Sequence, residues 1–323
     1  MKYYQIFNGM TLRISLYAAF YILLLSCKGS NETQNVVLTN YASIEHLIEA
    51  KELVKILEES NTKIVDFRSP EKYQAGHIKG SINIWRTDIS DNSLPYEGIR
   101  ADKKQIELLF GRLGIENDDL IIVYDDKGSS DAARLWCIFE GLNFDSVKIL
   151  NGGLKSWESM GGKLTKELYT YTPSQFQFPE KSNENLWIDK EELKGLFSDE
   201  QHSNITIVDT RNAEEYSGIL IKKGASKAGR IPESIHIDWA EAVDLEHSKK
   251  FRSIEELQKI YNGLEMNIKD TVIVYCHSGY RSSLTTFVLK ELMGFENVRN
   301  YDGSWVEWSY FNDLPYEKDS LIL

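Results

Sequence analysis

The chain has 323 residues, which is enough for two domains, and its hydrophobic share of 42% and charged share of 27% are those of a globular protein. Its formal net charge of −12 argues against nucleic acid as a partner, because an acidic surface repels a polyanion. It holds only three cysteines, Cys27, Cys137 and Cys276, too few for a disulfide framework.

The N-terminus has the features of an export signal. Lys2 and Arg13 accompany an apolar run over 14–25, which is too short to span a membrane and ends in the residues LLSC, similar to a bacterial lipobox. We therefore expect a signal peptide over 1–26, a lipid on Cys27 and a polar tether over 27–40. The protein would then be an exported, periplasmic or cell-surface lipoprotein that meets the membrane through its anchor alone. A plain secretory signal with an incidental cysteine is the alternative.

The rest of the chain is a tandem repeat. Residues 64–73 (IVDFRSPEKY) match 207–216 (IVDTRNAEEY), and 76–84 match 229–237. Further on, 121–125 (IIVYD) match 272–276 (VIVYC), and 151–157 match 302–308. The second copy carries an insertion between Ser217 and Ala228. An ordered match over this length indicates duplication.

Each copy alternates apolar strands with amphipathic helices, for example over 103–113 and 254–264. Such alternation predicts the α/β class, with a parallel sheet and helices on both of its faces. We expect domain 1 over 41–166 and domain 2 over 188–323. The segment 167–187 between them contains Pro173 and Pro179 and is predicted to be an extended linker.

Cys276 follows the apolar run 271–275 directly, and the polar loop after it leads into an apolar helix face. The carboxyl end of a parallel strand is where α/β sheets place ligands, and a helix N-terminus offers free N–H groups to an anion. Together with the nearby Arg281, this setting should favour a thiolate. A small buried hydrophobe is the alternative for Cys276, and Cys137, within an apolar helix, is expected to be inert.

The length of the loop narrows the chemistry. Cysteine phosphatases use a Cys-x5-Arg loop to wrap phosphate, whereas four residues separate Cys276 from Arg281. A smaller ring of N–H groups suits one sulfur atom better than a tetrahedral phosphate, which predicts a persulfide on Cys276. A phosphatase or an arsenate reductase on the same scaffold remains a less favoured alternative.

Several motifs give the chain a family resemblance. These are the paired Asp-x-Arg strand ends, the segments GHI at 76–78 and GRIP at 229–232, the cysteine loop, and YDGSWVEW at 301–308. Over about 41–317 the chain resembles the two-domain rhodaneses, the thiosulfate and 3-mercaptopyruvate sulfurtransferases. The resemblance implies two tandem rhodanese-like domains, of which the first is not catalytic. Asp125 stands where the second copy has Cys276, and a carboxylate cannot be persulfidated.

The resemblance also implies an activity. A sulfane sulfur would move from a small anionic donor, thiosulfate or 3-mercaptopyruvate, to a thiol or cyanide by way of Cys276, without a metal or an organic cofactor. Ser278 and Gly279 agree with the mercaptopyruvate pattern, but His277, Tyr280 and Arg281 agree with neither pattern, so the donor stays open. A non-enzymatic sulfur-binding or redox-sensing module is the alternative function.

The candidate substrate-binding residues share proximity to the cysteine loop or to the neighbouring strand end; they are Arg211, Arg230, His277, Ser278, Gly279, Tyr280 and Arg281. The loop N–H groups should stabilise the thiolate, and Gly279 should permit the tight backbone path. Arg281 and Arg211 are candidates to bind an anionic donor. The alternatives are a structural ion pair to the neighbouring domain for Arg281 and a scaffold role for Arg211, because domain 1 keeps the equivalent Arg68 without a nucleophile.

Two further expectations concern side chains near this loop. His277 is a candidate acid or base, with a surface position as its alternative. Ser278 is a candidate hydrogen-bond donor to sulfur. The insertion carries Lys222, Lys223 and Lys227, with Arg230 at its edge, and we expect this basic cluster to cover the site and attract anionic donors unless it is a solvated loop.

Overall fold

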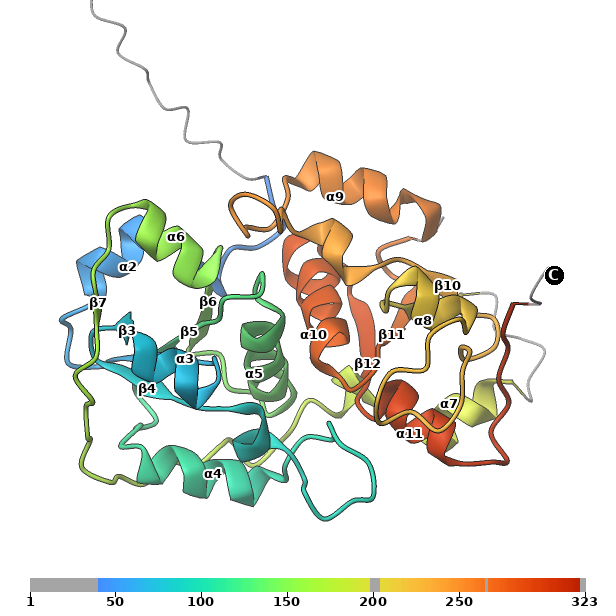
Figure 1. Cartoon of the computed structure of the whole chain (residues 1–323), viewed down its shortest axis with the longest axis horizontal. Helices are drawn as coiled ribbons and strands as arrows, with labels where there is room; N and C mark the ends of the chain where they lie inside the picture. Colours follow the sequence, from blue (N-terminus) through green and yellow to red (C-terminus); the bar gives the residue numbers. More distant parts are fainter. Residues whose placement is uncertain (1–39, 198–203, 265–266, 320–323) are drawn as a thin grey trace, which may run out of the picture. The chain divides into compact units, whose positions relative to one another are not determined.

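The computed structural model describes residues 40–197, 204–264 and 267–319 (Figure 1). The predicted signal peptide and Cys27 lie outside these residues, as does the predicted tether except for Asn40. Residues from Asn40 onward form one compact unit. None of the helices in this described part has the length and apolarity needed to cross a membrane.

The first repeat builds a five-stranded parallel sheet in the order β1-β6-β5-β2-β4. Its strands are β1 (Leu47–Ile48), β2 (Thr62–Asp66), β4 (Ser81–Asn83), β5 (Leu120–Tyr124) and β6 (Val147–Leu150). Its helices are α2 (Ala50–Ile56), α3 (Pro70–Ala75), η1 (Arg86–Ile89), α4 (Lys103–Arg112), α5 (Ser130–Gly141) and α6 (Gly153–Ser159). A small antiparallel pair joins β3 (His77–Ile78) to β7 (Leu164–Thr165).

The second repeat builds the same sheet, in the equivalent order β8-β12-β11-β9-β10. Its strands are β8 (Trp187–Ile188), β9 (Ile205–Asp209), β10 (Ile235–His236), β11 (Thr271–Tyr275) and β12 (Asn297–Tyr301). Its helices are η2 (Glu184–Leu186), α7 (Lys190–Leu196), α8 (Ala213–Ser217), η3 (Trp239–Ala242), α9 (Ile254–Tyr261), η4 (Asn262–Leu264), α10 (Tyr280–Phe287), the π-helical turn η5 (Val288–Leu292) and α11 (Ser304–Tyr310). The equal strand order confirms the predicted α/β duplication.

Alternating side chains send each sheet's two faces into different cores. In domain 1, Ile64 and Ile122 pack with α2 and α6, whereas Val65 and Val123 face α4 and α5. Domain 2 repeats the arrangement with α7 and α11 on one face and α9 and α10 on the other. Helices therefore cover both faces of each sheet, as predicted.

The predicted linker is not free of either domain. It runs without helix or strand to Asn183 and then enters η2 and the first residue of β8. Phe176 and Phe178 are buried among aromatic rings of α4 and α5, with Phe176 lying 5.4 Å from Phe110 and Phe178 5.4 Å from Phe139 between ring centroids. The segment thus extends the core of domain 1. The predicted domain boundaries themselves remain predictions.

One apolar cluster runs through both domains, because α5 and α10 pack against each other (Figure 1). Trp136 of α5 meets Phe287 of α10 edge to face, with centroids 4.8 Å apart. These two residues occupy equivalent positions in the two repeats, so the domains meet about a local pseudo-two-fold relation. The polar contacts repeat it: Arg100 N donates to Asp302 Oδ2 (3.0 Å), and Phe251 N donates to Asn151 Oδ1 (3.1 Å).

A buried ion pair crosses the same interface. Arg134 of α5 is 1% exposed and donates to Asp302 Oδ1 at 2.5 Å and to the Gly98 carbonyl at 2.8 Å. Burial alone would raise the pKa of Asp302, but the charges of Arg134 and Arg100 outweigh it and lower the pKa. The carboxylate therefore stays ionised and holds the loop before α11 to domain 1.

We expect Asp302→Asn to lower the free energy of unfolding by about 3 kcal/mol at neutral pH, because it leaves the Arg134 charge buried without its counterion. The wild-type pair stabilises fully above the unfolded carboxyl pKa of about 3.9 and is lost as pH falls through the lower folded value. Urea unfolding at neutral and acidic pH should show that Asp302→Asn loses this part of the acid sensitivity.

Asp313 provides the matched control, since its pair with Lys194 is exposed and should contribute far less to stability. Equal stabilities of Asp302→Asn and Asp313→Asn would contradict the structural importance of the buried pair.

Candidate active site

Cys276 lies immediately after β11, the central strand of the second sheet, and just before the loop that opens α10. The strand end is held by Tyr275, whose hydroxyl donates to Asp209 Oδ2 at 2.6 Å and accepts from Ile231 N at 3.1 Å. Gly279 has a φ of +82°, in the left-handed region that glycine adopts at least cost. The backbone can therefore curl back around the sulfur, as the sequence predicts. Cys276 itself is 1% exposed.

The N-terminus of α11 holds the cysteine from its other side. Trp305 N donates to the Cys276 carbonyl and Val306 N to the His277 carbonyl, both at 3.0 Å. Ser304 Oγ accepts from Cys276 N at 3.1 Å, donates to the Tyr301 carbonyl at 2.9 Å and lies 4.0 Å from Sγ.

Ser304 reaches this position from a strained backbone. Its φ is +51°, which costs a non-glycine residue of order 1–3 kcal/mol. The equivalent residue in domain 1 is Gly153, with nearly the same φ of +53° and no hydroxyl to offer. The copy that has the cysteine thus places a serine in this strained conformation, whereas the copy that has Asp125 places a glycine there.

The surroundings of Cys276 favour its ionised form. Burial would raise the pKa of the thiol, but the positive charge of Arg281 and hydrogen bonds from Ser282 and Ser278 outweigh burial, and the pKa is lowered. Cys137 is the contrast within the same chain, because burial raises the pKa of its thiol to about 12. Of these two thiols, only Cys276 has surroundings that lower its pKa and favour the thiolate.

The loop of domain 1 that is equivalent to the cysteine loop binds the carboxyl group of Asp125 through its backbone N–H groups. Asp125 Oδ1 accepts from the backbone N–H groups of Lys127 and Ser129, both at 2.9 Å. Its Oδ2 accepts from those of Asp131 at 2.8 Å and Ala132 at 3.0 Å. Four N–H groups thus converge on the carboxyl oxygens of Asp125 and favour its ionised form, although burial and the charge of Asp131 leave the pKa of this carboxyl raised. The loop of domain 2 has the same length and presents a sulfur at the same point.

Arg281 approaches the cysteine already paired. Its two terminal nitrogens donate to Glu215 of α8 at 2.6 and 2.8 Å, in a bidentate pair within domain 2. Glu215 is 2% exposed, and Arg281 lowers its pKa despite burial. The guanidinium therefore contributes charge to the thiolate, while its best donors face a carboxylate rather than open space.

Arg211 is placed as a scaffold residue. It is 1% exposed, forms a bidentate pair with Asp209, and donates to the Gly229 carbonyl at 2.7 Å. Arg68 of domain 1 makes the same contacts with Asp66 and with the Gly76 carbonyl, also at 2.7 Å. Because the copy without a nucleophile keeps the whole network, the placement favours the scaffold alternative over substrate contact.

Arg230 is likewise engaged away from the cysteine. Its Nη1 donates to Asp319 Oδ1 at 2.8 Å, its Nε lies 3.6 Å from Glu317 Oε2, and its guanidinium stacks on Tyr216 at 4.5 Å. These contacts tie the C-terminal segment to domain 2. The geometry therefore gives no support to a substrate role for Arg230.

His277 is buried, not on the surface. Its Nε2 donates to the Lys223 carbonyl at 2.9 Å, whereas its Nδ1 has no hydrogen bond in the described part of the chain and lies 3.9 Å from Glu215 Oε1. Burial and the charge of Lys222 lower its pKa to about 4. The ring is neutral at physiological pH and holds the insertion against the cysteine loop.

Tyr280 and Ser278 face domain 1. Arg86 stacks on the Tyr280 ring at 4.2 Å, and Arg134 lies 5.4 Å from it. Gly98 approaches Ser278 so closely that a Cβ at Gly98 would be 2.5 Å from Ser278 Cβ. Domain 1 thus covers one side of the cysteine loop.

The insertion of the second copy covers another side of the cysteine loop. The predicted basic cluster does not stay together there: two of its members lie at the loop and two bind elsewhere. Lys227 donates to the Phe311 carbonyl at 2.7 Å, and Trp305 Nε1 donates to the Lys227 carbonyl at 3.0 Å. Lys227 therefore anchors the insertion to α11, and Arg230 binds the C-terminal segment. Lys222 and Lys223 remain at the cysteine loop.

Glu215 and Ser304 are the site residues that the sequence analysis missed. Both occupy positions where the copies differ, since Lys72 stands in place of Glu215 and Gly153 in place of Ser304. A comparison restricted to such differences would have found them.

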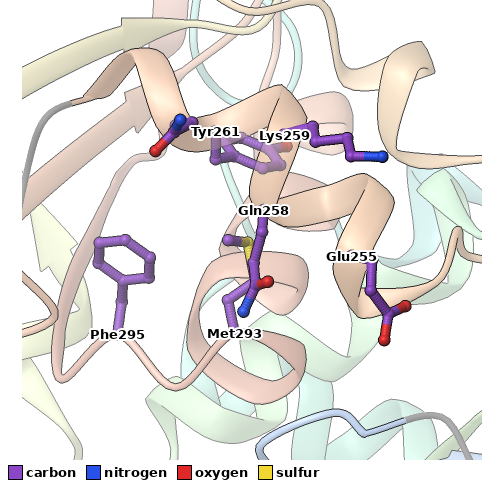
Figure 2. A pocket seen from close by; sticks show the side chains of 7 residues that line it. Glu255, Gln258, Lys259, Tyr261, Met293 and Phe295 are labelled. Atoms are coloured by element: carbon purple, nitrogen blue, oxygen red, sulfur yellow. The ribbon is translucent and has the colours of Figure 1, made fainter.

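A groove of about 520 Å³ lies elsewhere, along α9 (Figure 2). It is lined by Glu255, Gln258, Lys259, Tyr261, Asn262, Met293 and Phe295. It contains no cysteine and none of the candidate residues. No cluster of metal-ligating side chains occurs among the described residues.

Comparison with known proteins gives one family. The model of the rhodanese-like domain matches residues 49–160 and again 189–310. A thiosulfate sulfurtransferase of Corynebacterium glutamicum is 33% identical over 285 residues, 86% of this chain and 92% of the relative. The sulfur carrier protein TtuD of Thermus thermophilus is 32% identical over 286 residues, 86% of this chain and 98% of the relative.

Solved structures share the fold. The anaerobic ergothioneine biosynthesis enzyme of Chlorobium limicola, in complex with trimethyl histidine, superposes with a TM-score of 0.73 at 24% identity, over 87% of this chain and 72% of that chain. YnjE superposes with a TM-score of 0.73 at 21% identity, over 87% and 70%.

The charge of Arg281 should have a measurable effect on the pKa of the Cys276 thiol. We expect the thiolate absorbance near 240 nm to titrate with a pKa below the roughly 8.5 of an unperturbed cysteine. The pair Arg281→Gln with Glu215→Gln keeps the shape of the bidentate contact without charge and should raise that pKa. The Cys276→Ser spectrum supplies the baseline. Identical titrations of wild type and double variant would rule out Arg281 as the stabilising charge.

Proposed function

This chain belongs to the rhodanese family, and we propose that it is a sulfurtransferase that carries sulfur as a persulfide on Cys276. The donor is a small anion with a transferable sulfur atom, thiosulfate or 3-mercaptopyruvate, and the acceptor is a thiol or cyanide. The observation that carries the proposal is the lowered pKa of Cys276 inside a loop whose counterpart in domain 1 directs four N–H groups at the carboxyl group of Asp125.

The first step loads the enzyme. With thiosulfate as donor, the Cys276 thiolate attacks the outer sulfur, a new S–S bond forms, and the bond between the two sulfurs of thiosulfate breaks. Sulfite leaves with the bonding electron pair, and the enzyme holds Cys–S–S⁻. No proton, oxidant or reductant is needed. The loop N–H groups and Arg281 stabilise the negative charge before and after transfer.

The second step returns the enzyme to its starting state. An acceptor thiolate attacks the outer sulfur of the persulfide and leaves as RS–S⁻, or cyanide leaves as thiocyanate, and the Cys276 thiolate is the leaving group. A low thiol pKa favours this departure as well as the first attack. Domain 1 takes no covalent part, because Asp125 occupies its loop.

Intact-mass spectrometry tests this chemistry directly. After incubation with thiosulfate or 3-mercaptopyruvate, we expect the wild type to gain the mass of one sulfur atom, and cyanide to remove it as thiocyanate. Cys276→Ser should gain nothing, whereas Cys137→Ala should behave like wild type because that thiol stays protonated.

No adduct on the wild type with either donor would overturn the proposal and leave the non-enzymatic alternative. Hydrolysis of a small aryl phosphate, lost in Cys276→Ser, would favour the phosphatase alternative. The ratio of initial rates with the two donors identifies the preferred one.

We also propose that the protein is exported and anchored through a lipid on Cys27, after removal of a signal peptide over 1–26. The support is the apolar run over 14–25 that ends in LLSC, followed by a polar tether. In this arrangement the enzyme meets the membrane through its anchor and keeps its site in the aqueous phase.

The anchor predicts a change of fraction in a bacterial host. The wild type should incorporate labelled palmitate and sediment with membranes, and Cys27→Ser should lose the label and appear among soluble proteins. Wild-type protein that is exported without label would instead support the plain secretory signal.

A further inference from the structure

An anionic donor needs a cation near Cys276, and three candidate arginines are already engaged. Arg211 is paired with Asp209, Arg230 with Asp319, and Arg281 with Glu215. When thiosulfate reacts, negative charge builds up on the departing sulfite. Because their hydrogen-bond donors already face carboxylates, these arginines do not offer a free donor to the departing sulfite.

The insertion of domain 2 brings another cation to the site. Its segment 222–225 forms a turn, closed by Ala225 N donating to the Lys222 carbonyl at 3.1 Å. The turn lies on the cysteine loop, because His277 Nε2 donates to the Lys223 carbonyl at 2.9 Å and a Cβ at Gly224 would lie 3.7 Å from the same nitrogen. Lys222 is therefore held beside the residue that follows Cys276.

The ammonium of Lys222 has no hydrogen bond or ion pair among the described residues. The neighbouring carboxylate, Glu215, directs its oxygens at Arg281. Burial and the charge of Arg281 lower the pKa of Lys222, and the charges of Glu215 and Cys276 counteract this only in part. The residue nevertheless keeps an exposed surface, so a solute can reach it.

We propose that Lys222 binds the anionic group of the sulfur donor and stabilises the departing sulfite, which makes it a specificity-determining residue. This inference rests on the proposed sulfur transfer. The donor supplies the direct ionic partner that no described residue gives to the Lys222 ammonium, which otherwise feels only the longer-range charges of Glu215 and Cys276. Domain 1 lacks the insertion and hence this cation, in keeping with its lack of a nucleophile.

The test compares an anionic with a neutral donor in the full-length protein. Thiosulfate is the anion, and bis(2-hydroxyethyl) trisulfide is the neutral donor. The Cys276 thiolate attacks its central sulfur and displaces one 2-mercaptoethanol thiolate, which then attacks the mixed trisulfide, releases bis(2-hydroxyethyl) disulfide and leaves Cys–S–S⁻. We expect Lys222→Gln to lower kcat/KM for thiosulfate by about 10- to 100-fold, the loss typical of a charge-assisted contact, and to change the value for the trisulfide less than about twofold. Lys222→Arg should restore most of the thiosulfate activity.

Lys223→Gln is the matched control. Lys223 lies in the same turn, but it contacts His277 through its backbone carbonyl and not through its side chain. It should therefore keep wild-type selectivity between the donors. Equal losses of kcat/KM for thiosulfate in Lys222→Gln and Lys223→Gln would show that only the overall positive charge of the turn matters. That result would overturn the inference. A loss with both donors in Lys222→Gln would reveal a structural role and overturn it too.

The outcomes separate the two proposals. Wild-type protein that forms no persulfide with either donor contradicts the proposed function. Wild-type protein that forms it, together with a Lys222→Gln variant of unchanged selectivity, contradicts only the role of Lys222.

Discussion

The buried pair between Arg134 and Asp302 is the contact on which the site depends. Asp302 begins the turn that leads into α11, and two residues later Ser304 meets the backbone of Cys276. The next N–H group, that of Trp305, holds the Cys276 carbonyl. Since Arg134 belongs to domain 1, the domain without a nucleophile fixes the support of the cysteine in the other domain. Arg134 also donates to the Gly98 carbonyl and so positions the loop of domain 1 that covers Ser278.

The two copies share one backbone fold but surround the loop after the central strand with different charges. In domain 1 the converging N–H groups are saturated by Asp125, and a lysine on α3, Lys72, pairs with the neighbouring Asp126. In domain 2 the equivalent of Lys72 is Glu215, which binds Arg281 and positions its charge near a thiolate. A few substitutions on a duplicated frame thus separate a closed, structural loop from one that can hold and release sulfur.

Periodicity and repetition predicted the fold and Cys276, because strand alternation and a thiol at a strand end are local patterns. Side-chain partners were harder to predict. Arg211 and Arg281 were candidate anion ligands with a scaffold role and an interdomain ion pair as their alternatives; Arg211 closes a network common to both copies, and Arg281 is bound by Glu215 of its own domain. His277, a candidate acid or base with a surface position as its alternative, is instead buried under the insertion with a lowered pKa. Each of these outcomes depends on residues distant in the chain that the strand order brings together.

The sequence by itself determined the α/β class and the duplication, and it predicted Cys276 as the nucleophile in a loop one residue shorter than that of cysteine phosphatases, because each follows from residue types and spacing along one segment. Only the tertiary structure decided which cations are neutralised, which backbone is strained and which domain supports the cysteine. Arg134, Ser304 and Lys222 acquire their meaning from contacts across the fold. Electrostatic availability depends on distance and burial in three dimensions, and linear spacing does not encode either.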